Sequence, residues 1–100
     1  MRRIILSKRA VNRLEKLLDY LELEWSLKVK NDFIKKLDKS LTQIQKLPES
    51  CPQSDFVKGL HMFVVTKQTS LYYRFDKNTV TIVTVFDNRM NPDRLKTEIG

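Results

Sequence analysis

Between Ser7 and Pro48 the apolar residues recur every three or four positions, which is the period of an amphipathic helix. A single helix of this length would have roughly 40 residues, whereas helices in globular proteins average about 12. We therefore expect a break at Trp25-Ser26 and a helical hairpin, with Ser7 and Ser26 as N-caps whose hydroxyl groups accept a backbone N–H. The first apolar stripe is Val11, Leu14, Leu17, Leu18, Leu21 and Trp25, and the second is Val29, Phe33, Leu37, Leu41 and Ile44.

Runs rich in β-branched and aromatic residues predict strands on both sides of the helical region. A loop from Pro48 to Gly59 follows the second helix, and the polar pairs Lys67-Gln68 and Lys77-Asn78 are connections of hairpin length. Beyond the last strand, Asn91-Pro92 favours one short helical turn. The predicted strands are Arg2–Leu6, Leu60–Thr66, Thr69–Asp76 and Thr79–Phe86.

The last strand is apolar on both faces, which is typical of a central strand. Strict alternation places Val80, Ile82 and Phe86 on one face, and Val83 and Val85 on the other. The order β-α-α-β-β-β predicts an α+β fold, a helical hairpin packed on a small, largely antiparallel sheet, with residues 1–100 as one domain. We expect one core that contains Trp25, Phe33, Leu37, Tyr73, Ile82 and Phe86.

The net charge of +7 gives the first indication of function. Residues 1–50 hold twelve basic and seven acidic groups (+5), and residues 51–100 hold seven and five (+2). Such an excess favours an acidic polypeptide or a nucleic acid as partner, and it also serves solubility. The sequence leaves both interpretations open.

Several classes of protein do not fit the composition. Only two glycines are present, so a glycine-rich phosphate loop is not expected, and no apolar run approaches the roughly 20 residues of a membrane helix. The apolar part of Arg2–Leu6 is too short for an export signal, and the single cysteine, Cys51, cannot form an internal disulfide. We expect a cytoplasmic protein without a cofactor, a metal ion or a membrane partner.

The sequence shows no familiar catalytic constellation. One histidine and one cysteine, His61 and Cys51, cannot form a zinc site by themselves, and nothing in the local sequence supports a Cys–His pair. A strand histidine of this kind is more often structural.

Basic residues are the remaining candidates for a site. Arg74 lies in a strand that alternates aromatic and basic side chains, which could contact nucleic acid; alternatively Tyr73 and Phe75 face the core while Tyr72 and Arg74 face solvent. Arg89 follows the last strand and could either hold a ligand or pair with Asp87 or Asp93. The lysines of the second helix are either a solvated face or a docking surface for an acidic partner; they include Lys30, Lys35, Lys36 and Lys39.

The whole pattern resembles the RelE/ParE toxin superfamily, over roughly residues 4–95. Tyr20 to Trp25, Phe33, Leu37, the loop prolines and Gly59-Leu60 resemble the helical hairpin and connector of ParE-type toxins. Leu71-Tyr72-Tyr73-Arg74, Val80–Phe86 and Asp87 to Pro92 resemble the last two strands and the closing segment. The closing Arg–x–Asn–Pro and the element order together carry the resemblance.

The resemblance implies a cytoplasmic toxin neutralised by a cognate antitoxin. It also implies that the antitoxin binds operator DNA, so that the toxin is linked to DNA only through the antitoxin. An acidic antitoxin tail would bind Lys35, Lys36 and Lys39, or Arg74 and Arg89, or the open strand edges. One branch of the superfamily cleaves messenger RNA on the ribosome, and the ParE-like branch poisons DNA gyrase. A non-toxic RNA- or protein-binding module is a further alternative.

Departures from the nuclease pattern favour the ParE-like branch. The nuclease branch usually has an arginine just before the Leu–x–Tyr of the third strand, and this chain has Ser70 at that position. No Tyr or His follows Tyr73, although Arg89 matches a basic position with which the nucleases hold phosphate. One basic group does not suffice for general acid–base catalysis, so we expect inhibition by binding, with Arg89 and Arg74 as the candidate catalytic residues of the alternative.

Overall fold

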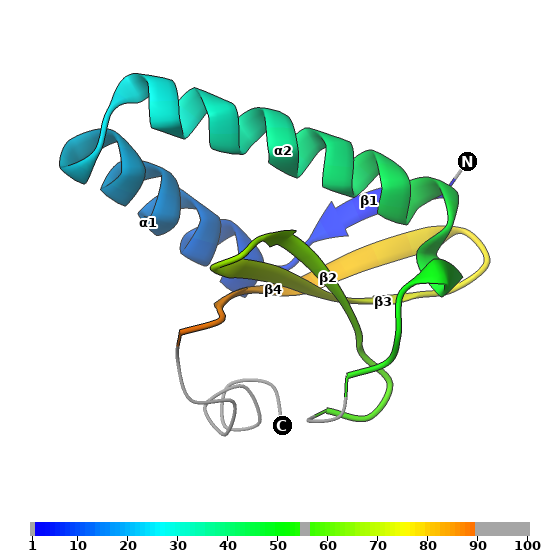
Figure 1. The fold of residues 1–100 in the computed structure, drawn as a ribbon. Helices are drawn as coiled ribbons and strands as arrows, with labels where there is room; N and C mark the ends of the chain where they lie inside the picture. Colours follow the sequence, from blue (N-terminus) through cyan, green and yellow to red (C-terminus); the bar gives the residue numbers. More distant parts are fainter. Residues whose placement is uncertain (1, 55–56, 90–100) are drawn as a thin grey trace.

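The chain folds into two layers, a helical hairpin and a four-stranded sheet (Figure 1). The computed structural model describes residues 2–54 and 57–89. The predicted α+β class and the order β-α-α-β-β-β are confirmed, while the expected turn at Asn91-Pro92 and any pair with Asp93 lie outside the described residues. The elements are β1 (Arg3–Leu6), α1 (Lys8–Glu24), α2 (Leu27–Lys46), the 3-10 turn η1 (Pro48–Ser50), β2 (His61–Thr66), β3 (Thr69–Phe75) and β4 (Thr79–Asp87).

The two helices begin at the predicted serine caps. The Ser7 Oγ accepts a hydrogen bond from the backbone N of Ala10 at 3.0 Å, and the Ser26 Oγ accepts one from the backbone N of Val29 at 3.1 Å. Each cap satisfies a backbone donor that the helix itself leaves free. The break at Trp25-Ser26 is therefore confirmed, and the second helix ends before Pro48 as expected.

The strand order in the sheet is β1-β4-β3-β2. β4 pairs in parallel with β1 and antiparallel with β3, so it is an inner strand, as its two apolar faces predict. The start of α1 is fixed to this strand, since Ser7 donates from its backbone N to the Ile82 carbonyl at 3.0 Å and from its Oγ to the Val83 carbonyl at 2.6 Å. These bonds hold the hairpin over one face of the sheet.

A β-bulge in β4 corrects the predicted division of its faces. Tyr72 is paired with Thr84 but Tyr73 with Ile82, so Val83 is an extra residue in the ladder. The extra residue reverses the alternation beyond it. Val85 therefore joins Val80 and Ile82 against the helices, and the prediction that Phe86 shares their face is wrong.

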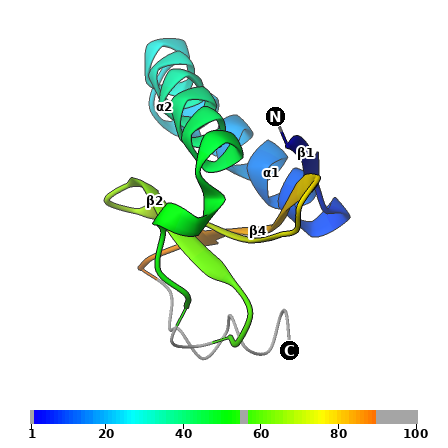
Figure 2. The ribbon, with the colours of Figure 1, turned by 90° about the vertical axis from the view of Figure 1, so that its right-hand side faces the viewer.

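The buried apolar residues form two clusters instead of the single predicted core. Phe33, Leu37, Tyr73 and Ile82 lie in the cluster between hairpin and sheet, as expected. A smaller cluster of Leu60, Tyr72 and Phe86 lies on the opposite face, where the connector between η1 and β2 passes beneath the sheet (Figure 2). The full membership of the first cluster is Ala10, Phe33, Leu37, Ile44, Leu71, Tyr73, Val80, Ile82 and Val85.

Two aromatic residues are placed differently from the prediction. Trp25 is 68% exposed, because α1 ends at Glu24 and Trp25 lies at the turn between the helices. Tyr72 is only 3% exposed, because Leu60 and its neighbours cover it. Arg74 faces solvent, as one of the two interpretations of this strand expects.

Candidate functional site: the hairpin groove

A cavity of about 510 Å³ lies between the helical hairpin and the end of the sheet where β4 ends. We call it the hairpin groove. One wall consists of side chains from both helices, and the other consists of residues at the β2–β3 turn and at the end of β4. The helical wall contains Leu17, Tyr20, Leu21, Trp25, Val29 and Phe33, and the sheet wall contains Thr66, Gln68, Thr69, Val85 and Phe86.

The helical wall leaves a large apolar surface open to solvent. Trp25 is 68% exposed, Tyr20 is 46% exposed and Val29 is 37% exposed. Apolar patches of this kind, framed by polar groups, mark sites where a protein binds a partner. Tryptophan and tyrosine are also the residues most enriched among the energetic centres of interfaces.

Charged side chains surround this apolar surface. Arg13, Asp32, Lys36, Asp87 and Arg89 line the groove, three basic residues against two acidic ones. The mixture suits a partner that carries an apolar face and a few acidic groups.

Asp87 and Arg89 form an ion pair at the rim. The Arg89 Nη2 lies 2.8 Å from the Asp87 Oδ2, and the Arg89 Nε lies 3.0 Å from the Oδ1. The backbone N of Arg89 donates to the same carboxylate at 2.9 Å, so the turn after β4 is ordered by one side chain. Of the two interpretations of Arg89 that the sequence leaves open, the structure shows the pairing with Asp87. The hydrogen bonds from Arg89 lower the pKa of Asp87, and those to Asp87 raise the pKa of Arg89.

This pair predicts a measurable titration. Because Arg89 stabilises the ionised carboxylate, the pKa of Asp87 in the folded protein should lie below its ordinary value near 3.9. The pair therefore contributes to stability above that ordinary pKa, and its contribution is lost as the pH falls through the lowered pKa. NMR titration of the Asp87 carboxyl should give a low pKa that rises in Arg89→Ala; an unchanged pKa in that variant would contradict the assignment.

The structure separates the candidate residues of the sequence into three places. Lys36 and Arg89 both line the groove. Lys35 and Lys39 are exposed elsewhere on α2, and Arg74 projects from the other face of the sheet. Tyr20, Trp25 and Val29 line the groove but were not among the candidates from the sequence, which placed Trp25 in the core and Val29 in the second apolar stripe. The position of Trp25 at the helix break was the available signal.

His61 has a structural setting rather than a catalytic one. Its Nδ1 lies 2.8 Å from the Cys51 carbonyl oxygen, and its ring stacks on Tyr73 at 5.5 Å between centroids. The Tyr73 hydroxyl donates to the Pro48 carbonyl at 2.6 Å, and burial together with contact to Cys51 raises its pKa. His61 therefore lies against the helix-facing core, on the face of the sheet opposite Arg74.

Residues 2–54 and 57–89 contain no group of three or more His, Cys, Asp or Glu arranged to hold a metal ion. In that same part of the chain, no helix has the length and apolar character needed to cross a membrane.

Comparison with known proteins assigns the fold to a family. Residues 4–92 match the ParE toxin family of type II toxin–antitoxin systems, parDE. The chain belongs to the ParE toxin family. The match begins at the second residue of β1, extends past the end of β4 and includes both walls of the groove. No curated protein sequence matches.

Solved structures share the fold of this ParE-family chain at low sequence identity. The chromosomal ParDE toxin–antitoxin system from P. aeruginosa superposes with a TM-score of 0.72 and 13% identity, covering 87% of this chain and 96% of that chain. The E. coli DinJ-YafQ complex gives 0.62 and 14%, over 88% and 93% of the two chains. The YoeB dimer from Staphylococcus aureus gives 0.57 and 17%, over 83% and 92%.

Proposed function

We propose that this toxin inhibits DNA gyrase by binding it, and that a cognate antitoxin neutralises the toxin by occupying the hairpin groove. Membership of the ParE toxin family supports the first part. The chemistry of the sheet face and the composition of the groove support the choice of binding over catalysis.

The burial of Ser70 is the observation on which this choice rests. Ser70 stands where the nuclease branch usually has an arginine, and it is completely buried. Its Oγ has no hydrogen-bond partner among the described residues. Tyr72 and Phe86, on the same face, are buried with Leu60 in an apolar cluster. A scissile phosphate would need cationic or hydrogen-bonding groups here, and these residues supply none that is accessible.

Arg89 and Arg74, the two candidate catalytic residues, do not replace the arginine that is missing at Ser70. The guanidinium of Arg89 is bound by the Asp87 carboxylate through three hydrogen bonds. Arg74 is paired in register with Thr81, near the opposite end of β4 from Asp87. General acid–base catalysis typically contributes 10²–10⁴-fold to a rate, and it requires that the general acid and the general base both reach the same substrate.

The groove supports the antitoxin part of the proposal. An antitoxin segment with an apolar face would cover Tyr20, Trp25 and Val29, and acidic residues beside that face would meet Lys36 and Arg89. The ParDE and DinJ-YafQ structures are both toxin–antitoxin assemblies. Lys35 and Lys39 extend the positive surface of α2 and would add long-range attraction.

A ribosome-dependent messenger RNA endonuclease is the second candidate. The likeness of this fold to YafQ and YoeB, and the position of Arg89, favour it. For that activity the Asp87–Arg89 pair would have to open so that Arg89 could contact phosphate.

Controlled expression in bacteria tests the proposal. If gyrase is the target, induction should trigger DNA damage signalling and filamentation while messenger RNA stays intact, and purified toxin should inhibit DNA supercoiling by gyrase. Coexpression of a cognate antitoxin should abolish both effects. Rapid transcript cleavage at ribosomal A sites, lost in Arg89→Ala, would overturn the proposal and make Arg89 catalytic; harmless expression would indicate a non-toxic binding module.

A further inference from the structure

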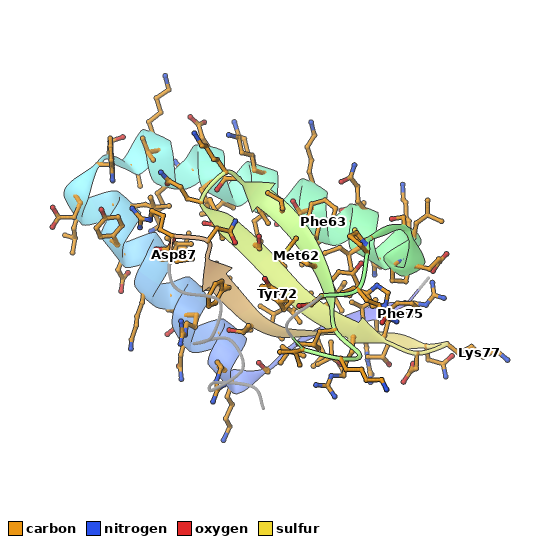
Figure 3. All side chains as sticks on the ribbon, turned by 60° about the horizontal axis from the view of Figure 1, so that its bottom comes forward. Met62, Phe63, Tyr72, Phe75, Lys77 and Asp87 are labelled. Atoms are coloured by element: carbon orange, nitrogen blue, oxygen red, sulfur yellow. The ribbon has the colours of Figure 1, made fainter. Side chains whose placement is uncertain are left out.

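A cluster of exposed basic residues lies at the far end of the sheet from the hairpin groove. Lys77, at the β3–β4 turn, and Asp87, at the rim of the groove, mark the two ends in Figure 3. The residues of this basic end are Arg3, Arg74 and Lys77, and all three are exposed.

The strand register places Arg3 and Arg74 on the same face of the sheet. Ile4 and Leu6 pack against the helix-facing core, so Arg3 and Ile5 point to the opposite face. Arg3 is paired with Thr79 on β4, and Arg74 is paired with Thr81 on β4. The two arginines therefore lie on either side of β4, with backbones about 12 Å apart across two strand spacings and a two-residue offset, and with two threonine hydroxyls between them.

The basic residues of this end form no ion pairs with other described residues. Neither Arg3, Arg74 nor Lys77 belongs to an ion pair between described residues. Arg2 does, since it lies 3.9 Å from Glu49 and over the Phe75 ring. The nearby Asp76 is occupied within the turn, where its Oδ1 accepts from the backbone N of Asn78 and of Thr79 at 2.8 and 2.9 Å. A net positive, hydroxyl-bearing surface remains.

We infer that this basic end binds the sugar–phosphate backbone of double-stranded DNA. Guanidinium groups bind phosphate oxygens with two donors at once, and threonine hydroxyls add neutral contacts. The aromatic residues described on this face, Tyr72 and Phe86, are each 3% exposed, so this face of the sheet offers no aromatic platform on which the bases of a single strand could stack. Contacts to the backbone alone make the binding independent of sequence.

The inference stands apart from the proposed inhibition of gyrase, since it concerns the toxin alone. Binding of a fluorescein-labelled DNA duplex should be measured by anisotropy at increasing salt. With three cationic contacts, the logarithm of the association constant should fall against the logarithm of salt concentration with a slope of about −2.7. Arg3→Gln/Arg74→Gln should reduce this slope by about 1.8 and weaken binding at low salt.

Matched variants and probes decide the outcome. Lys35→Gln/Lys39→Gln removes the same charge from α2 and should leave the slope unchanged. Equal losses in both double variants would show a general charge effect and overturn the inference. Absence of binding at low salt, or a preference for single-stranded RNA of the same length, would also overturn it. Circular dichroism should confirm that both double variants are folded, since all four residues are exposed.

Discussion

Replacing Phe33 by alanine is expected to lower the free energy of unfolding by about 3–5 kcal/mol. Phe33 is 7% exposed and packs in the main core cluster while its edge lines the hairpin groove. The substitution removes a buried aromatic ring and leaves a cavity where helix α2 meets the sheet. Domains of this size have about 5–15 kcal/mol of stability, so the variant should be marginally folded. Urea denaturation followed by circular dichroism measures the loss.

A matched substitution on the same hairpin separates burial from helix effects. Leu23 is 80% exposed, so Leu23→Ala should change the free energy of unfolding by no more than about 0.5 kcal/mol. A loss below about 1 kcal/mol for Phe33→Ala would contradict the packing described here. An equal loss for Leu23→Ala would show that the hairpin tip is covered in solution.

Local signals were sufficient to predict the elements of this fold. Ser7 and Ser26 indicate where the helices begin, because a capping hydroxyl accepts a hydrogen bond from a backbone N within three residues of its own position. The two-residue connections and the doubly apolar last strand likewise indicate the hairpins and the inner position of β4. Each of these signals depends on neighbours in the sequence, so no tertiary information was required.

The errors arose where distant segments decide the outcome. The bulge at Val83 depends on how β4 pairs with β3, and one extra residue moved Phe86 to the other face. Tyr72 is buried by a connector that the sequence indicated only as a loop. Helical periodicity assigned Trp25 to the core, although the helix ends one residue before it and the hairpin tip extends past the sheet.

The candidate site was only partly predictable for the same reason. Arg89 and Lys36 stand out as basic residues, but they line the same groove only because the end of β4 lies close to the helical hairpin. The residues of the apolar groove wall could not be distinguished from core residues in the sequence, because a buried stripe and an exposed stripe of a helix have the same spacing. Arg74 was identified as a candidate, yet its relation to Arg3 becomes visible only through the parallel pairing of β1 with β4.

The exposed Trp25 should dominate the binding of the antitoxin. Its ring lies at the groove with 68% of its surface open, so a bound segment can bury a large apolar area there without first disturbing the core. Trp25→Ala is expected to weaken the complex by at least about 2 kcal/mol, roughly 30-fold in dissociation constant, as the central aromatic residues of interfaces do. Because Trp25 is the single tryptophan of the chain, binding to the unaltered toxin should also shift its fluorescence to shorter wavelength.

Leu27→Ala supplies the control for this prediction. Leu27 is 57% exposed and lies two residues from Trp25, but it does not line the groove. Calorimetric titration of Leu27→Ala with a cognate antitoxin should therefore give an affinity close to that of the unaltered toxin. Both variants should unfold at nearly the same urea concentration as the unaltered toxin, because neither side chain is buried. If Trp25→Ala binds the antitoxin as tightly as Leu27→Ala does, the antitoxin does not use the hairpin groove. That result would leave the proposed inhibition of gyrase untouched, because the supercoiling assay tests it separately.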